Sequence, residues 1–107
     1  MKEILVVGGG AAGIAAALSA AEAGGRVTIL EGLNRPGKKL LVTGNGRCNL
    51  GNTRIAPECY HTARPDRLKV LLKQMPATLT TDFFERWGLM TMADEAGRLY
   101  PYCRQAS

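Results

Sequence analysis

The chain is poor in the residues that build disulfide frameworks, zinc sites and membrane spans. Its 107 residues include 3 cysteines, and no two of them are spaced as Cys-x-x-Cys. This excludes a disulfide-stapled scaffold and a zinc pattern, and it favours a reducing compartment. No apolar run approaches the roughly 18 residues of a membrane span, and glycines interrupt the apolar N-terminal stretch that a signal peptide would need. The sequence therefore predicts a cytoplasmic protein without a membrane partner or a metal site.

Runs of like charge are also absent. Lys and Arg number 14 against 9 Asp and Glu, a net charge of +5, but only Lys38 and Lys39 are adjacent. Aromatic residues make up 6% of the chain and do not alternate with the basic ones. A nucleic-acid-binding surface usually gathers its basic residues into a patch or stripe. The scattered charge therefore favours a small phosphorylated ligand, and no nucleic-acid partner is expected.

The N-terminal residues follow the order strand, turn, helix, strand, within a chain whose hydrophobic fraction of 46% excludes disorder. Residues 3–7 are apolar apart from Glu3 and do not alternate with polar residues. This predicts a parallel strand buried on both faces, and residues 27–30 predict a second one. A helix over residues 14–23 is expected between them, ended by Gly24 and Gly25. The helix face expected to pack on the strands consists of Ile14, Leu18 and Ala21.

The turn after the first strand has the spacing Gly8-x-Gly10-x-x-Gly13. Gly8 permits the tight turn, Gly10 lets the backbone approach a pyrophosphate, and Gly13 lets the helix pack closely. The helix N-terminus then offers free N–H groups and a positive dipole to the phosphates. Glu31, at the end of the second strand, can accept a hydrogen bond from a ribose 2′-hydroxyl and disfavours NADP. Residues 1–31 are therefore predicted to be a dinucleotide-binding unit for FAD or NAD.

A long Gly- and Asn-rich loop is predicted over residues 32–52, where Leu40–Val42 is the only apolar run. A loop of this length within a domain is usually functional, and the alternative is a mobile surface linker. The apolar residues favour the functional interpretation because they can anchor the loop.

Helices and a hairpin are predicted after the loop. The helices are expected over residues 65–74 and about 82–87, the second capped by one of the threonines before it. Residues 89–93 and 98–102 flank a turn and predict an antiparallel hairpin. The aromatic residues expected in the core of this region are Phe83, Phe84 and Trp87.

Two segments resemble elements of one flavoprotein family. Residues 35–49 read RPGKKLLVTGNGRCN, and residues 97–101 read GRLYP. Both are similar to segments of the BaiN-type family of FAD-dependent oxidoreductases, which are related to the glutathione-reductase-like flavoproteins. The resemblance extends from the first strand to the last residue. It implies that the chain is the N-terminal part of an FAD-binding Rossmann-like domain, with a substrate domain and further FAD contacts elsewhere in the parent protein.

The expected fold class is α/β, with an N-terminal Rossmann-like βαβ unit, a helical segment and a C-terminal β-hairpin. The domain is expected to be incomplete, because a doubly wound sheet needs about five or six strands. Its expected parts are the βαβ unit at 1–31, the cofactor loop at 32–52, and the helices and hairpin at 65–107.

The loop has groups that suit a flavin, although Gly and Asn also simply favour turns. Gly44 and Gly46 allow backbone N–H groups to approach a flat ring or a phosphate. Neutral side chains can pair with the flavin carbonyls and ring nitrogens, and basic ones can neutralise pyrophosphate or the charge of a reduced flavin. The neutral residues are Thr43, Asn45 and Asn49, and the basic residues are Lys38, Lys39 and Arg47.

No catalytic acid or base can be assigned from the sequence. Cys48 is expected to be a small buried residue, since disulfide-reductase chemistry needs a second nearby cysteine. His61, the single histidine, is expected at the surface. The candidate cofactor-binding residues are Gly8, Gly10, Ala11, Ala12, Gly13, Glu31, Gly37, Lys38, Lys39, Thr43, Gly44, Asn45, Gly46, Arg47, Cys48 and Asn49.

These features favour an FAD-dependent oxidoreductase that passes a hydride between NAD(P)H and a small organic substrate. The resemblance suggests reduction of an activated carbon–carbon double bond as one such reaction. One alternative is an NAD-dependent dehydrogenase, which leaves the Gly- and Asn-rich loop unexplained. Another is a flavin-dependent tRNA-modifying or RNA-binding protein, against which the scattered charge counts. The isolated chain is expected to bind FAD weakly or not at all.

Overall fold

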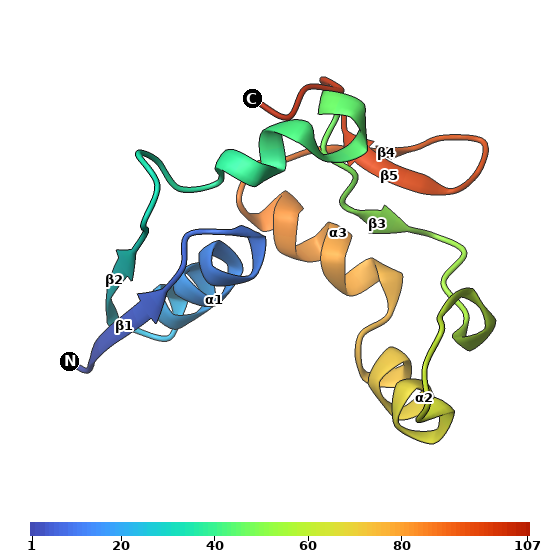
Figure 1. The fold of residues 1–107 in the computed structure, drawn as a ribbon, viewed down its shortest axis with the longest axis horizontal. Helices are drawn as coiled ribbons and strands as arrows, with labels where there is room; N and C mark the ends of the chain where they lie inside the picture. The colour runs from blue at the N-terminus through green and yellow to red at the C-terminus, as the bar shows by residue number, and fades with distance from the viewer. The chain divides into compact units, whose positions relative to one another are not determined.

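The computed structural model describes all residues from Met1 to Ser107. It contains two compact units, whose residues can be followed in Figure 1 by the colour of the ribbon. Unit 1 comprises Met1–Gly46 together with Ala106–Ser107, and unit 2 comprises Arg47–Gln105. Each unit has its own sheet and its own buried residues.

Unit 1 begins with a parallel βαβ arrangement (Figure 1). Strand β1 (Glu3–Val7) leads through the glycine turn into helix α1 (Ala11–Glu22), which is followed by strand β2 (Arg26–Leu30). The two strands pair in parallel along their whole length. This confirms the predicted Rossmann-like start of an α/β fold.

Helix α1 begins at Ala11, earlier than the predicted start at residue 14. Gly10 is the last residue with extended backbone, at φ −80° and ψ −174°. The residues that follow it belong to the glycine motif but are mostly alanine, which favours a helix. At the other end, Gly24 has a φ of +84°. The predicted left-handed glycine stop is therefore confirmed.

The two strands are covered on one face only. Exposed and half-buried residues alternate along both strands, and Leu5, Val7 and Leu30 are 60%, 81% and 51% exposed. The prediction of strands buried on both faces is wrong for this chain, because α1 packs on one face and leaves these side chains uncovered. On the helix, Ala17 is buried, whereas Ala21, which was predicted to face the strands, is exposed.

Glycines allow α1 to lie close to the strands. A Cβ atom at Gly13 would overlap the backbone oxygen of Gly8, and one at Gly25 would lie 2.6 Å from Ile4 Cδ1. Real Cβ atoms do not approach other atoms this closely, so the close packing depends on the missing side chains.

The segment predicted as a long loop contains regular structure. A 3₁₀ segment, η1 (Lys38–Gly46), lies in unit 1 and is interrupted by non-helical backbone angles at residues 43–45. Leu40 and Leu41 are half-buried, whereas Val42 is 72% exposed. The apolar anchor predicted for the loop is therefore limited to the two leucines.

Unit 2 contains a three-stranded antiparallel sheet in the order β3-β5-β4. Strands β4 (Thr91–Ala93) and β5 (Arg98–Pro101) form the predicted hairpin. Strand β3 (Gly51–Asn52) pairs with the other edge of β5 and was not predicted, because two residues are too few to show a periodicity. Leu99 and Tyr100 on β5 are each 4% exposed and form the buried centre of unit 2.

The helices of unit 2 follow one another around Pro76. A short 3₁₀ turn, η2 (Pro57–Cys59), precedes helix α2 (Pro65–Gln74), which has the predicted bounds. Helix α3 (Ala77–Arg86) starts well before the predicted residue 82. Pro76 is its N-cap, with φ −64° and ψ 158°, so the proline that ends α2 also starts α3. The predicted threonine cap is wrong, since the caps of this helix include no side-chain hydrogen bond.

The aromatic residues of α3 are only partly enclosed. Phe83 and Phe84 are half-buried and meet edge to face, with ring centroids 5.4 Å apart. Trp87, the C-cap, is 45% exposed. The prediction of a core position is therefore wrong for Trp87, which lies at the end of the helix.

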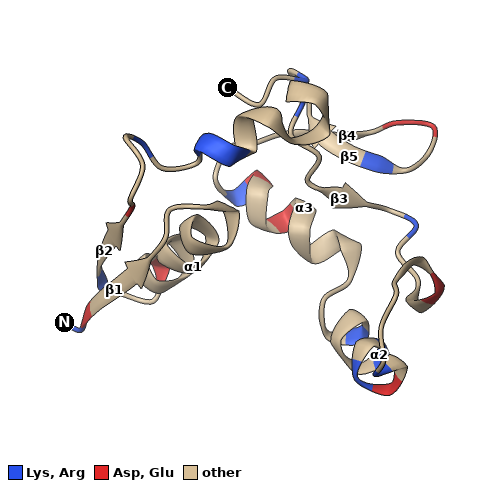
Figure 2. Cartoon of the chain, viewed as in Figure 1, with Lys and Arg blue, Asp and Glu red and all other residues tan.

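Charged residues are distributed over the elements of both units (Figure 2). Lys and Arg lie on η1, on α2, in the hairpin and at several turns, interspersed with Asp and Glu. None of the helices combines the length and the apolar character that crossing a bilayer requires.

Candidate dinucleotide-binding site

The glycine turn of unit 1 is the centre of the candidate site. Gly8 has a φ of +99°, and its N–H donates to the Leu30 carbonyl oxygen at 2.7 Å, which extends the β1–β2 pairing into the turn. Gly10 is the N-cap of α1, and its carbonyl oxygen accepts from the Ile14 N–H at 2.9 Å. No side chain caps this helix end, and its first turn holds no acidic residue. The N–H groups of residues 11–13 are therefore suited to an anion.

The space beside Gly10 distinguishes this residue from its neighbours. A Cβ atom at Gly10 would meet no atom within 4 Å, whereas one at Gly13 would overlap the Gly8 carbonyl oxygen. The packing of unit 1 thus requires a glycine at position 13 but not at position 10. A glycine that the protein's own packing does not require, at an uncapped helix N-terminus, fits the close approach of a pyrophosphate. These residues therefore fit the phosphates of FAD.

Glu31 follows β2, and its carboxylate reaches back to the glycine turn. Its Oε2 accepts from the Gly9 N–H at 2.7 Å, and its Oε1 accepts from the Leu33 N–H at 2.8 Å. These hydrogen bonds, from Leu33 first and Gly9 second, hold the pKa of Glu31 below its ordinary value of 4.5. The group is therefore an anion at neutral pH, and its remaining lone pairs can accept ribose hydroxyls while its charge repels a 2′-phosphate.

Gly9 is a residue of the site that the sequence reasoning missed. It is buried, and besides its N–H bond to Glu31 its carbonyl oxygen accepts from the Gly37 N–H at 2.7 Å. A Cβ atom at Gly9 would lie 2.9 Å from Glu31 Oε2 and 2.9 Å from Pro36 Cβ. The available signal was its place within three consecutive glycines, of which the dinucleotide motif explains only the outer two.

Two basic residues of the loop, Lys38 and Lys39, lie at the start of η1. Lys38 Nζ donates to Asn34 Oδ1 at 3.3 Å on the surface, and Lys39 is exposed. Gly37, just before them, has a φ of +69° and joins the loop to the glycine turn through the bond to Gly9. The structure thus places these candidates in the same unit as the glycine turn.

The end of η1 contains a left-handed stretch of backbone. Gly44, Asn45 and Gly46 have φ values of 56°, 54° and 78°. Thr43 Oγ1 donates to the Leu40 carbonyl oxygen at 2.7 Å, so its hydroxyl proton is engaged within the segment. Glycine and asparagine are the residues that tolerate this conformation best. The backbone conformation alone therefore explains why residues 44–46 are Gly-Asn-Gly, and no ligand is needed to explain it.

The last residues of the flavoprotein-like segment belong to unit 2. The Arg47 guanidinium lies over the Tyr100 ring, with its central carbon 4.6 Å from the centroid, and its Nη2 donates to Tyr100 Oη at 3.4 Å. Cys48 is a free, half-buried thiol with a φ of +60°, so its expected burial is only partial. Asn49 is exposed. The two segments of the resemblance therefore meet within unit 2 through Arg47 and Tyr100.

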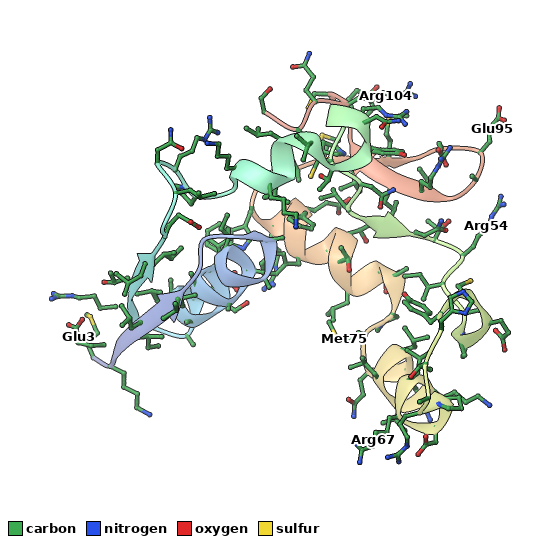
Figure 3. All side chains as sticks on the ribbon, in the orientation of Figure 1. Glu3, Arg54, Arg67, Met75, Glu95 and Arg104 are labelled. Carbon is green, nitrogen blue, oxygen red and sulfur yellow. The ribbon has the colours of Figure 1, made fainter.

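The hairpin segment GRLYP is accounted for by local structure. A Cβ atom at Gly97 would lie 2.6 Å from Thr53 Oγ1, and Arg98 forms an ion pair with Asp94, from Nε to Oδ2, at 2.8 Å. Arg54, which follows β3, and Glu95, in the β4–β5 turn, lie at the same end of unit 2 (Figure 3), where Arg54 Nη2 donates to the Glu95 carbonyl oxygen at 2.8 Å. These contacts show that the segment shapes the hairpin.

Residues with acid–base or metal-binding potential do not gather in either unit. His61 is exposed, as predicted, and no group of three or more His, Cys, Asp or Glu residues could hold a metal ion. No catalytic side chain is therefore assigned beside the candidate dinucleotide site.

Comparison with known proteins yields one family and several relatives. The family described as HI0933-like protein Rossmann domain matches residues 2–107. The chain is 44% identical over 109 residues to a 3-dehydro-bile acid delta(4,6)-reductase of Clostridium scindens, covering 100% of this chain and 26% of the relative. It is 30% identical over 98 residues to a ribosomal RNA dihydrouridine synthase of Escherichia coli, covering 92% and 24%. The corresponding Haemophilus influenzae protein is 29% identical over 99 residues, covering 92% and 22%. The chain thus spans about a quarter of the length of these relatives.

Proposed function

Since the chain belongs to the HI0933-like Rossmann domain family of FAD-dependent oxidoreductases, we propose that it supplies the dinucleotide site of a reductase that saturates an activated carbon–carbon double bond. The observation that carries this proposal is the uncapped N-terminus of α1 beside Gly10, where a Cβ atom would meet no atom of the protein. The space is suited to a pyrophosphate, and Glu31 is suited to the adenosine ribose.

The residues of unit 1 bind and orient the cofactor in this proposal. The N–H groups at the start of α1 hold the phosphates, and Lys38 and Lys39 add positive charge beside them. Glu31 accepts a hydrogen bond from a ribose hydroxyl and rejects NADP at this position. A bound flavin would carry a hydride from NAD(P)H to one carbon of the double bond, and a proton would reach the other carbon.

The substrate class is inferred from what the relatives' names share. One name describes a delta(4,6)-reductase of a 3-dehydro bile acid, and the other describes a synthase of dihydrouridine in ribosomal RNA. Both names denote the saturation of a carbon–carbon double bond. We favour a small-molecule substrate with a double bond conjugated to a carbonyl group, because the relative at 44% identity acts on such a compound.

The experiment uses the purified full-length protein under anaerobic conditions, because the isolated chain is expected to bind FAD weakly or not at all. NADH or NADPH is expected to bleach the flavin absorption, and a 3-oxo-Δ4 steroid is then expected to restore it while gaining two hydrogen atoms, as seen by mass spectrometry. A flavin that NAD(P)H reduces but that no conjugated enone reoxidises would contradict the substrate class. A protein that binds NAD but no flavin would support the dehydrogenase alternative instead.

A second candidate substrate is RNA, and the specific observation in its favour is the similarity to two ribosomal RNA dihydrouridine synthases. The net charge of +5 is compatible with it. In that case, uridine-containing ribosomal RNA would reoxidise the reduced flavin and the enone would not. Binding of the RNA would also weaken steeply with salt, because phosphate contacts release counterions.

A further inference from the structure

The glycine turn is tied to the loop after β2 by both backbone groups of one residue. The Gly9 N–H donates to Glu31 Oε2 at 2.7 Å, and the Gly9 carbonyl oxygen accepts from the Gly37 N–H at 2.7 Å. The loop between these two contacts is held at its start by the Leu33 N–H, which donates to Glu31 Oε1 at 2.8 Å. We call this set of hydrogen bonds, formed by Gly9, Glu31, Leu33 and Gly37, the Gly9 brace.

The carboxylate of Glu31 has a role in the brace that an amide cannot fill. Each of its two oxygens accepts a different backbone N–H, from Gly9 and from Leu33. A glutamine at this position has one acceptor oxygen and one NH₂ donor. Its NH₂ would therefore face one of the two N–H donors, and one backbone group would lose its partner. The ribose contact alone does not impose this demand, since an amide can pair with a hydroxyl.

The packing around Gly9 shows that the brace is closely fitted. Gly9 is buried, and a Cβ atom there would lie 2.9 Å from Glu31 Oε2 and 3.3 Å from Pro36 Cα. At Gly10, one residue further, a Cβ atom would meet nothing within 4 Å. The two adjacent glycines thus serve different purposes. The brace leaves no room for a side chain at Gly9, whereas the absence of a side chain at Gly10 keeps the space beside the helix open.

We propose that Glu31 is a positioning residue for the phosphate site, which it holds in shape through the Gly9 brace before any nucleotide binds. This proposal rests on the proposed function, because the site it positions is the one assigned to FAD. The brace fixes the residue directly before Gly10, and so fixes the start of α1. Donors that are already oriented cost less conformational entropy on binding, which strengthens the affinity for the ligand.

The first test measures amide hydrogen exchange by NMR in the flavin-free protein. In Glu31→Gln, the amide that faces the new NH₂ group, that of Gly9 or that of Leu33, is expected to exchange about tenfold faster or more than in the wild type, the effect of losing one hydrogen bond. The Gly8 amide is the internal reference, because it donates to the Leu30 backbone oxygen and not to Glu31. Unchanged exchange of both the Gly9 and the Leu33 amides would overturn the brace, and so would an acceleration that the Gly8 amide shares equally, which would mean that the strand end opens as a whole.

The second test separates positioning from the ribose contact. FAD and an FAD analogue whose adenosine ribose lacks the 2′ and 3′ hydroxyls are titrated into wild-type and Glu31→Gln protein. If Glu31 acts through the brace, the variant binds the analogue about tenfold more weakly than the wild type does. If Glu31 acts only through the ribose, wild type and variant bind the analogue equally, and the proposal is overturned.

Two alanine variants provide matched controls for the exchange experiment. Gly9→Ala is expected to accelerate exchange of the Leu33 and Gly37 amides, because its Cβ displaces both Glu31 and Pro36. Gly10→Ala is expected to leave these amides protected, because its Cβ enters open space. If the Leu33 and Gly37 amides stayed protected from exchange in Gly9→Ala, the proposal would be contradicted. A protein that shows the brace but binds no FAD would contradict the proposed function and leave the brace intact, so the two failures are distinguishable.

Discussion

Individual glycines of the turn meet different physical demands, and Gly13 illustrates the strictest of them. A Cβ atom at this position would overlap the backbone oxygen of Gly8. Replacing a glycine inside a helix by alanine ordinarily stabilises the helix by about 1 kcal/mol. Here the overlap forces the backbone to shift, which costs more than the helix gains.

Gly13→Ala is therefore predicted to lower the stability of the protein by about 1–3 kcal/mol, despite the better helix propensity of alanine. The matched variant is Ala16→Ser, an exposed substitution in the same helix, which should change stability by less than about 0.5 kcal/mol. Thermal unfolding followed by circular dichroism measures both. A melting temperature for Gly13→Ala at or above that of the wild type would show that the helix does not pack on the turn as described.

The charge of Glu31 leads to a prediction about pH. Its pKa in the folded protein lies below the ordinary value of 4.5, so its contribution to stability is complete above that value and is lost as the pH falls through the lower, folded pKa. The difference in melting temperature between wild type and Glu31→Gln should thus be constant near neutral pH and shrink below about pH 4.

Comparing the two proteins isolates Glu31 from the other acids that titrate in the same range. Asp66 and Asp94 also have lowered pKa values, but they are present in both proteins and cancel. A difference that grew as the solution became more acidic would show that the hydrogen bonds to Gly9 and Leu33 favour the protonated form, against the geometry.

Among the elements, strand β5 carries the buried residues of unit 2. Leu99 and Tyr100 are each 4% exposed, and Tyr100 also stacks beneath Arg47. The hydroxyl of Tyr100 adds only a long hydrogen bond of 3.4 Å from Arg47 Nη2. Most of the contribution of Tyr100 to stability should therefore come from its ring.

Tyr100→Ala is predicted to cost about 3–5 kcal/mol, as for other large aromatic residues removed from a core, whereas Tyr100→Phe should cost less than about 1 kcal/mol. Val70→Ala on α2, where Val70 is 58% exposed, is the control that should have little effect. Urea unfolding gives all three values. Equal losses for the Phe and Ala variants would mean that the hydroxyl, and not the ring, holds the sheet together.

Elements marked by proline or glycine were those that the sequence predicted best. Pro65 fixed the start of α2 and Gly24 fixed the end of α1. Pro76, between the two predicted helices, caps the start of α3, which was predicted five residues too late. Strand β3 depends on pairing with β5, a partner more than forty residues away in the chain, and its two residues carry no local signal of their own.

The candidate site was predictable in its motif and not in its internal contacts. The spacing of Gly8, Gly10 and Gly13 after an apolar strand indicates a phosphate turn, and Glu31 was correctly expected after β2. The bond between Glu31 and Gly9 was not predictable, because it depends on the path of the loop that brings Gly37 back to the turn. The prediction that both faces of the strands are buried was wrong for a similar reason, because an apolar sequence does not show which element covers it.

For the whole molecule, the uncovered face of the β1–β2 sheet is the most consequential feature. Leu5, Val7 and Leu30 lie on it and are more than half exposed. Apolar side chains gathered on a sheet face favour association with other surfaces. The 107-residue chain is therefore expected to self-associate through this face at high concentration.

Leu5→Thr combined with Val7→Thr is predicted to reduce this self-association, because threonine keeps the β propensity and removes apolar surface. Analytical ultracentrifugation of the two proteins at equal concentration measures the effect. Val6→Thr is the matched control, since Val6 lies on the half-buried face; it should lower the melting temperature without changing association. Unchanged association of the double variant would show that another surface is responsible.

Calorimetric titration of the flavin-free full-length protein with FAD and with NAD⁺ shows whether the glycine turn binds FAD. We expect one FAD per protein molecule, binding at least about tenfold more tightly than NAD⁺, and loss of FAD binding in a Gly10→Ala variant that still unfolds at the wild-type temperature. NAD⁺ binding as tightly as FAD, or a Gly10→Ala protein that binds FAD like the wild type, would contradict this expectation.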